Sequence, residues 1–155
     1  MSQSSKKHPE ERLSFLVHRV NAGLTRVSKP MFKQHGLDPV TSRILVLVLN
    51  REQTLVGDVI EFLGLPQSTV SHQIKRLENA GLLRRARDAD DNRAYRLSLT
   101  TKGRRTAEFC DQRSLKLNQA LVRQLNGRNG HAIFEQLHEL ADLLEAIDPD
   151  SLEKR

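Results

Sequence analysis

One helical segment carries side chains that are suited to contact a nucleic acid. Within residues 67–80, a turn of about 100° per residue places Val70, Ile74 and Leu77 together on one apolar face. Hydroxyl, amide, imidazole and cationic groups occupy the rest of the surface, at Gln67, Ser68, Thr69, Ser71, His72, Lys75 and Arg76. Such groups can bind base edges and phosphates, as can the free N–H groups of a first helical turn. An ordinary solvent-exposed helix is polar outside as well, so this pattern alone leaves both interpretations open.

The positive charge of the chain is concentrated around this helix. Residues 75–105 contain ten Lys or Arg against four Asp or Glu, a local excess of +6. The whole chain of 155 residues also has a net charge of +6, so the remaining residues balance to zero. A run of charge is often only a solvated face, but a local basic segment of this kind favours an anionic partner such as nucleic acid.

The segments on either side of this helix predict how it is positioned. A short helix over 54–64 precedes it, and Gly64-Leu65-Pro66 forms a tight break, as in a helix-turn-helix. After Gly81 the pattern alternates, which predicts a strand at 95–99 paired with one at about 82–87. The polar run 88–92 forms the tip of this hairpin. A helix-turn-helix followed by a basic two-stranded wing is the winged-helix arrangement.

Longer helices are expected at both ends of the chain. An apolar stripe at helical spacing runs through 9–36, with Gly36 as its C-terminal cap and Pro30 as a residue that can kink or end it. Asp38-Pro39 marks the start of a second helix, whose apolar run 44–49 forms the centre of the core. Two further amphipathic helices follow, from 101 to 125 and from 133 to 147. The predicted fold is therefore mainly α with a small β-hairpin wing.

The wing has an arginine near its tip that is suited to a DNA groove. Arg93 can enter the minor groove, where a narrow width strengthens the negative potential. Asp91, two residues earlier, has the spacing to hold the Arg93 guanidinium in a fork. In the alternative interpretation, Asp91 and Arg93 only lock the turn.

These residues resemble the multiple antibiotic resistance regulator (MarR) family of bacterial winged-helix transcription factors. The strongest match is Asp91-x-Arg93-x-x-x-Leu97-x-Leu99-Thr100-x-x-Gly103, which is similar to the wing signature of the family. Upstream, Gly64-Leu65-Pro66-Gln67-Ser68-Thr69-Val70-Ser71, Arg76-Leu77-Glu78 and Gly81-Leu82 are similar to its recognition helix. Pro66 departs from the polar cap common in the family, which puts the first helical residue in doubt. Gly57 weakens the preceding helix by up to about 1 kcal/mol relative to Ala.

The resemblance, together with apolar stripes on the first and last helices that a chain of 155 residues has little core left to cover, predicts a homodimer that binds a palindromic operator in double-stranded DNA. Winged helices that pair on a two-fold axis read half-sites roughly 34 Å apart. The domains expected are a disordered tail at 1–8, a dimerisation region at 9–36 and 101–148, and a winged helix-turn-helix at 38–100, all within a single compact chain. The expected interface consists of Leu13, Leu16, Val17, Val20, Leu137, Leu140, Leu144 and Ile147. In the alternative, these side chains cover only the core of their own subunit.

The signal to which the protein responds is less well defined by its residues. The resemblance implies a repressor released by a small amphipathic or phenolic ligand, bound between the dimerisation helices and the DNA-binding heads. A redox-responsive protein would need an exposed, acidic thiol, whereas Cys110 fits a packed helical position. A metal-responsive one would need more than His131 and His138, which are two turns apart with no ligand cluster around them. We therefore expect neither a metal nor a cofactor.

Other classes of function fit the sequence less well. No phosphate loop, nucleophile elbow or paired His and carboxylate motif is present, so an enzyme is not expected. A winged helix that binds protein would need an apolar recognition face, which Ser68, His72, Lys75 and Asn79 do not supply. The chain has no long apolar segment and one cysteine, so we expect a cytoplasmic protein without a membrane anchor.

Overall fold

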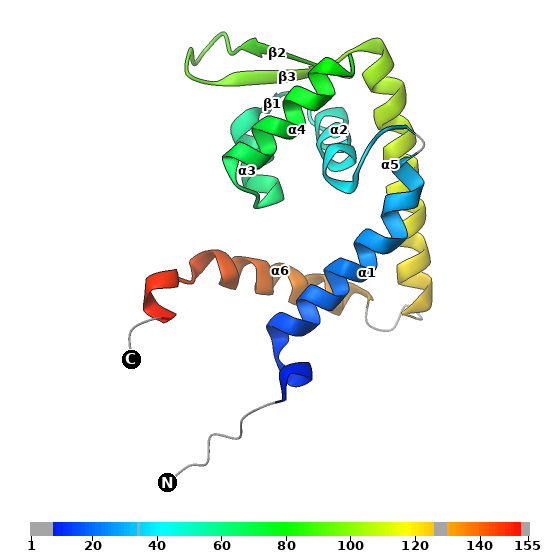
Figure 1. Ribbon diagram of the computed structural model, residues 1–155, viewed down its shortest axis with the longest axis vertical. Helices are drawn as coiled ribbons and strands as arrows, with labels where there is room; N and C mark the ends of the chain where they lie inside the picture. The colour runs from blue at the N-terminus through cyan, green and yellow to red at the C-terminus, as the bar shows by residue number, and fades with distance from the viewer. Residues whose placement is uncertain (1–7, 34, 126–129, 153–155) are drawn as a thin grey trace. The chain divides into compact units, whose positions relative to one another are not determined.

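A computed structural model describes residues 8–33, 35–125 and 130–152 of the chain (Figure 1). The disordered tail expected at 1–8 therefore lies outside the described residues, apart from His8. The helices are η1 (Pro9–Glu11), α1 (Leu13–Lys33), α2 (Pro39–Asn50), α3 (Val56–Leu63), α4 (Gln67–Asn79), α5 (Thr101–Gln124), α6 (Gly130–Ala146) and η2 (Pro149–Leu152). The strands are β1 (Thr54–Leu55), β2 (Leu83–Arg87) and β3 (Tyr95–Leu99). The fold is mainly helical with a small sheet, as the sequence predicts.

The chain divides into two compact units, Met1–Arg113 and Ser114–Arg155. The boundary falls within α5. The buried residues of this helix are Gly103, Ala107 and Cys110, all in its first half. The second half of α5 adds nothing to the core of the first unit, which gives the division a physical basis. The assignment of regions to DNA binding and to dimerisation stays a prediction.

Helix α2 forms the centre of the first unit, and its start is fixed by local hydrogen bonds. Asp38 Oδ1 accepts hydrogen bonds from the backbone N–H groups of Val40 and Thr41, both at 2.9 Å. The Thr41 hydroxyl in turn accepts from the Asp38 N–H at 2.9 Å, which completes a capping box. Ile44 and Leu45 are fully buried in the core of this unit. The predicted cap and the predicted core centre are both confirmed.

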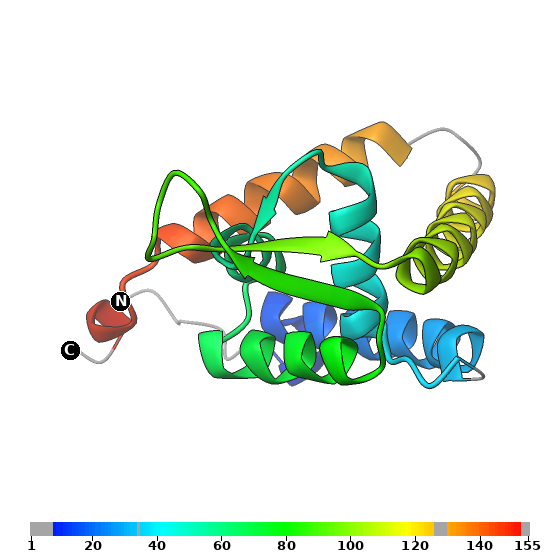
Figure 2. The same cartoon turned by 90° about the horizontal axis from the view of Figure 1, so that it is seen from above.

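The sheet has three strands rather than the two that the sequence predicts. Their order is β1-β3-β2, and both pairings are antiparallel. The unpredicted strand β1 pairs Thr54 with Leu97 and Leu55 with Arg96. Two residues are too few to show an alternating pattern, and the sequence assigned them to the helix that follows. Figure 2 shows the β2–β3 hairpin running alongside α4.

Two turns and one close approach hold the wing and α5 against α4. Gly64 and Gly81 both have a positive φ, of 58° and 69°, and end α3 and α4 as expected. At Gly103, a Cβ atom would lie only 1.8 Å from the carbonyl oxygen of Leu82. The Thr100 hydroxyl donates to the Gly81 carbonyl oxygen at 2.6 Å. The start of α5 is therefore pressed against the turn that follows α4.

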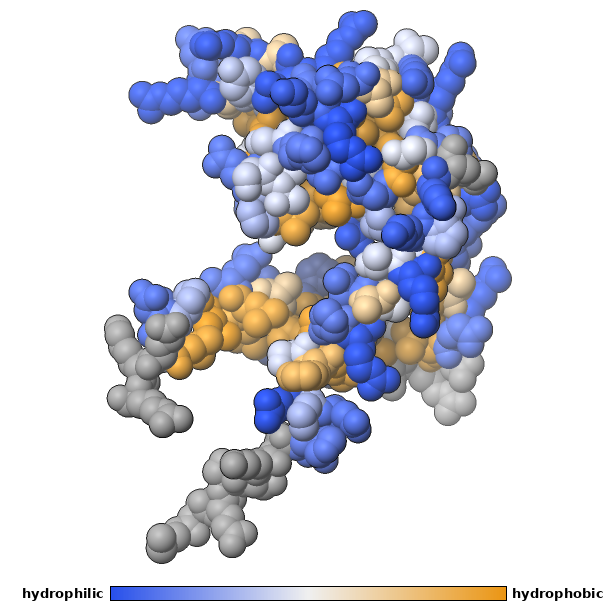
Figure 3. All heavy atoms as spheres, in the orientation of Figure 1, coloured by the Kyte–Doolittle hydropathy of each residue, from blue (hydrophilic) through white to orange (hydrophobic). Residues whose placement is uncertain are grey.

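Helices α1 and α6, near the two ends of the chain, bury few of their residues. Helix α1 continues through Pro30 to Lys33, and its buried residues are Ser28 and Phe32. Helix α6 has no buried residue. Hydrophobic side chains gather along the visible side of α6 (Figure 3). Among the described helices, none is both long enough and apolar enough to cross a membrane.

Candidate nucleic-acid interface

Helix α4 presents the face that the sequence predicts. Val70, Ile74 and Leu77 are at most 1% exposed and pack into the core. Ser71 is half-buried, whereas the exposed residues are Gln67, Ser68, Thr69, His72, Lys75 and Arg76. Hydrophilic side chains cover the visible side of α4 and of the wing (Figure 3). The orientation of the helix is thus as expected, while the DNA contact of each residue stays a prediction.

The start of α4 is open to an anion. The helix begins at Gln67, which settles the doubt that Pro66 raised. Pro66 is the N-cap residue, and no side chain makes a capping hydrogen bond there. The first N–H groups of a helix have no partner within the helix, and the helix dipole adds positive potential at this end. An uncapped, exposed N-terminus of this kind can bind a phosphate.

Arg76 has side-chain partners within the protein. Its Nη1 atom lies 2.6 Å from Asp38 Oδ2 and 2.9 Å from Gln73 Oε1. Partial burial raises the pKa of Asp38, but the Thr41 N–H and the Arg76 guanidinium outweigh this effect and hold it below its usual value. Within the described part of the chain, the structure records no hydrogen bond or ion pair for the Lys75 side chain.

The tip of the wing exposes Arg93, but Asp91 supports it differently from our expectation. Asp91 Oδ1 accepts a hydrogen bond from the Arg93 backbone N–H at 2.8 Å. Among the described residues, no ion pair joins this carboxylate to the Arg93 guanidinium. The fork predicted from the two-residue spacing is therefore not formed here, and the recorded bond is the one to the backbone N–H. Asp91 locks the turn, and the Arg93 side chain is left exposed.

The carboxylate that organises the wing is Asp88, which sequence reasoning treated as part of the polar tip. Asp88 is only 6% exposed. It accepts hydrogen bonds from the Arg96 guanidinium at 2.5 and 2.8 Å, and from the N–H groups of Asp90 and Asp91. These bonds, led by those from Arg96, lower the pKa of Asp88. The signal in the sequence was an Asp at the end of one strand and an Arg early in the next.

Of the remaining arginines of the wing, one contacts other side chains of the protein and two are exposed to solvent. Arg85 lies over the Tyr95 ring at 4.8 Å and is 3.9 Å from Glu78 of α4. Arg84 and Arg87 are exposed on the same strand. Part of the basic segment therefore holds the wing to α4, and part remains available to an anionic partner.

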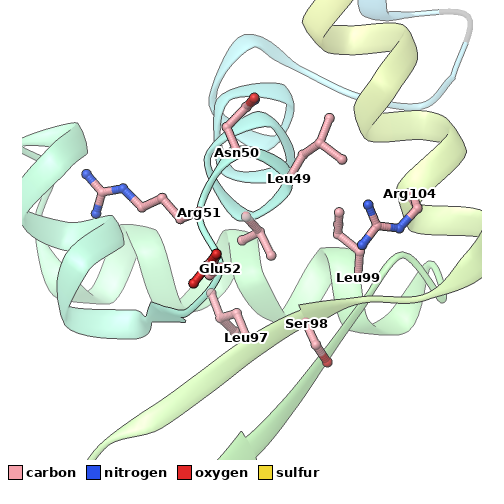
Figure 4. Close-up of a pocket in the computed structure, with 9 residues that line it drawn as sticks. Leu49, Asn50, Arg51, Glu52, Leu97, Ser98, Leu99 and Arg104 are labelled. Atoms are coloured by element: carbon pink, nitrogen blue, oxygen red, sulfur yellow. The ribbon is translucent and has the colours of Figure 1, made fainter.

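The first unit also contains a pocket of about 320 Å³ beside the base of the wing (Figure 4). It lies between the C-terminal end of α2, strand β3 and the first turn of α5. Its lining residues are Val48, Leu49, Asn50, Arg51, Glu52, Leu97, Ser98, Leu99 and Arg104. Leucine side chains form part of its wall, and its charged lining residues are Arg51, Glu52 and Arg104.

Cys110 and the histidines show no sign of a redox or metal site. Cys110 is fully buried, and burial raises the pKa of its thiol to about 11, which keeps it protonated and unreactive near neutral pH. His131 lies 3.1 Å from Glu135, and His138 contacts the Phe134 carbonyl oxygen. Over residues 8–33, 35–125 and 130–152, no group of three or more His, Cys, Asp or Glu could hold a metal ion.

The side chains expected at a dimer interface are largely exposed in the single chain. Leu140 is half-buried. The others have between 37% and 57% of their surface exposed: Leu13, Leu16, Val17, Val20, Leu137, Leu144 and Ile147. Their role at a dimer interface stays a prediction.

Comparisons with known proteins agree with this geometry. A model of the MarR family matches residues 35–94, which contain α2, α3, α4 and most of the wing. The transcriptional regulator TtmR of Methylorubrum extorquens is 31% identical over 107 residues, which make up 67% of this chain but only 55% of TtmR.

Solved structures share the fold over a larger part of the chain. The complex of Staphylococcus aureus MepR with DNA has a TM-score of 0.78 at 21% identity, covering 86% of this chain and 98% of MepR. BpsR of Bordetella bronchiseptica, whose DNA binding is regulated by 6-hydroxynicotinic acid, has a TM-score of 0.76 at 23% identity over 87% of this chain and 96% of BpsR. With a recognition helix, a wing and the family model in agreement, this chain belongs to the MarR family of winged-helix proteins.

Proposed function

We propose that the protein is a homodimeric, sequence-specific DNA-binding transcription regulator that acts as a repressor. The observation that carries this proposal is the exposed polar face of α4, with its uncapped N-terminus, in one unit with a wing that exposes Arg93. A helix and a wing placed in this way can contact the major and minor grooves of one duplex. The proposed contacts are Gln67, Ser68, Thr69, Ser71, His72, Lys75, Arg76 and Arg93, with Asp91 supporting the wing.

Relatives of the chain support the same class of function. TtmR is a transcriptional regulator, and MepR forms a complex with DNA. Members of the MarR family are transcription regulators and not enzymes, which sets this chain apart from catalysts. A regulator of transcription works where the chromosome is, so a cytoplasmic location is part of the proposal.

A second copy of the chain is the proposed partner of the exposed hydrophobic faces of α1 and α6. Exposed apolar faces of this extent mark protein interaction sites. Two copies on a two-fold axis would also double the contacts that one recognition helix makes, and they would select a palindromic operator. Repression would end when a small amphipathic or phenolic ligand binds one arrangement of the two heads better than the other. BpsR, with its 6-hydroxynicotinic acid, gives such a ligand a precedent in this fold.

The test is a selection of genomic fragments on the purified protein, followed by binding measurements on the enriched sequence. We expect a two-fold symmetric site with half-sites about one helical turn, roughly 34 Å, apart. The affinity for this site should exceed that for a scrambled duplex and should fall steeply as KCl rises. The proposal would be overturned if no sequence were enriched and the affinity for DNA did not change with the KCl concentration. Release from the enriched site by a panel of aromatic carboxylates and phenols tests the ligand.

A further inference from the structure

We propose that Arg76 is a positioning residue, which holds recognition helix α4 to the start of α2 through Asp38 and so sets the orientation in which α4 meets DNA. The inference rests on the proposed function and changes the role expected for one of its residues. Arg76 is one of two exposed cations of α4, with Lys75, that the sequence assigns to the DNA. In the structure, however, the charged group nearest to the Arg76 guanidinium is a carboxylate of the same chain, that of Asp38.

The geometry of the guanidinium supports this role. Nη1 carries two hydrogens, and the two acceptors around it are Asp38 Oδ2 and Gln73 Oε1. Gln73 comes from the preceding turn of α4, whereas Asp38 is 38 residues away in the chain. One nitrogen thus bonds at the same time to its own helix and to a different element. A side chain held at two points keeps its place better than a free surface cation does.

Asp38 is a firm anchor because its two carboxylate oxygens perform separate tasks. Oδ1 takes the N–H groups of Val40 and Thr41 and caps α2, while Oδ2 takes Arg76. Helix α2 also contains Ile44 and Leu45, which are fully buried. The Arg76 contact therefore joins the edge of α4 to the start of the best-buried helix of the unit.

The contact between Arg76 and Asp38 fixes the rotation of α4 about its own axis, which the hydrophobic face of the helix does not do. Val70, Ile74 and Leu77 hold α4 against the core, but apolar packing has little directional preference. A charged hydrogen bond at the edge of the helix opposes rotation about its axis. Base recognition depends on that rotation, because it aims Ser68 and His72 at the groove, whereas attraction to phosphates depends much less on it.

The neighbouring Lys75 is a matched control on the same helix. Both side chains are exposed cations, but the charge of Arg76 is compensated by Asp38 at 2.6 Å, while the described chain records no such partner for Lys75. Lys75 should therefore release counterions on binding DNA, and Arg76 should release few. The two residues are expected to affect binding in different ways, which an experiment can separate.

The experiment compares Asp38→Asn, Arg76→Gln, their double variant and Lys75→Gln with the unaltered protein. Asn retains a side-chain oxygen that caps a helix nearly as well as Asp, so Asp38→Asn removes the charge and keeps the cap. Affinity is measured on the enriched symmetric site and on a scrambled duplex over a series of KCl concentrations. Circular dichroism confirms that each variant is folded. Arg76→Lys, which keeps a cation near Asp38, should recover part of the loss.

The expected readout is the ratio of specific to scrambled affinity. Both single variants should lower this ratio by about 3- to 10-fold, a modest effect because the pair is partly exposed to solvent. The double variant should fall no further, because both changes remove the same contact. Arg76→Gln should leave the salt slope unchanged, whereas Lys75→Gln should reduce it by up to about one unit.

Other outcomes overturn the inference in distinguishable ways. If Asp38→Asn raises affinity on both duplexes, Asp38 only competes with phosphate for Arg76. If Arg76→Gln reduces the salt slope as Lys75→Gln does and leaves the ratio intact, Arg76 is a phosphate contact. If the unaltered protein does not distinguish the two duplexes, the proposed function fails and this inference fails with it.

Discussion

Helices α4 and α6 both carry a stripe of hydrophobic side chains, but only α4 buries its stripe. Val70, Ile74 and Leu77 are at most 1% exposed, whereas Leu137 and Leu144 are more than half exposed. Burial of a large apolar side chain contributes about 1.5–3 kcal/mol, so the first unit gains this stabilisation within one chain and α6 does not. A single chain therefore completes the core of the winged helix, whereas the exposed apolar face of α6 is where the proposed second copy would bind.

The largest effect is expected from a charge placed in the apolar face of α6, which should abolish the proposed dimer. We expect Leu144→Arg to convert a dimer into single chains of 17.7 kDa, because a guanidinium cannot be buried unpaired between two apolar faces. Affinity for the symmetric site should fall by about 10²- to 10⁴-fold as the second recognition helix is lost. Light scattering and operator titration measure the two effects. Leu144→Met is the control, and an unchanged mass for Leu144→Arg would remove α6 from the interface.

A cavity made in the buried stripe of α4 should instead lower the free energy of unfolding and leave the dimer intact. Ile74→Ala should destabilise the protein by about 2–5 kcal/mol, because it deletes fully packed atoms from the core of the first unit. Urea unfolding measures the loss, and Ile74→Val should cost only about 0.5–1.5 kcal/mol. The folded remainder of Ile74→Ala should still have the mass of a dimer. A loss below that of the Val variant would mean that α4 is less firmly packed than its burial indicates.

The features of the fold that could be predicted from the sequence depend on neighbouring residues. The capping box at Asp38 and the positive φ of Gly64 and Gly81 follow from local stereochemistry, and each lies where its residue type indicates. The buried side of α4 follows from helical spacing alone. In each case the residues that decide the structure lie within one or two turns of chain.

The features that could not be predicted depend on partners far along the chain. Strand β1 forms because β3 is there to pair with it, since Thr54 and Leu55 have no pattern of their own. The Asp38–Arg76 contact joins positions 38 residues apart, and Asp88 is buried because Arg96 lies across the hairpin. Nothing in the sequence around Asp38 or around Arg76 indicates that these two side chains will meet.

The exposed arginines of the wing sharpen the comparison, because they are cations, whereas the exposed stripe of α6 is hydrophobic. Arg93→Ala should weaken operator binding by about 1–3 kcal/mol while the unfolding midpoint stays the same, because its exposed guanidinium has no packing to lose. Arg84→Ala, on the strand rather than at the tip, is the matched control and should have a smaller effect. If both arginines matter equally, the wing attracts DNA only through its general charge. A loss confined to Arg93, and largest on the symmetric site, would instead mean that the turn locked by Asp91 aims one guanidinium into a groove.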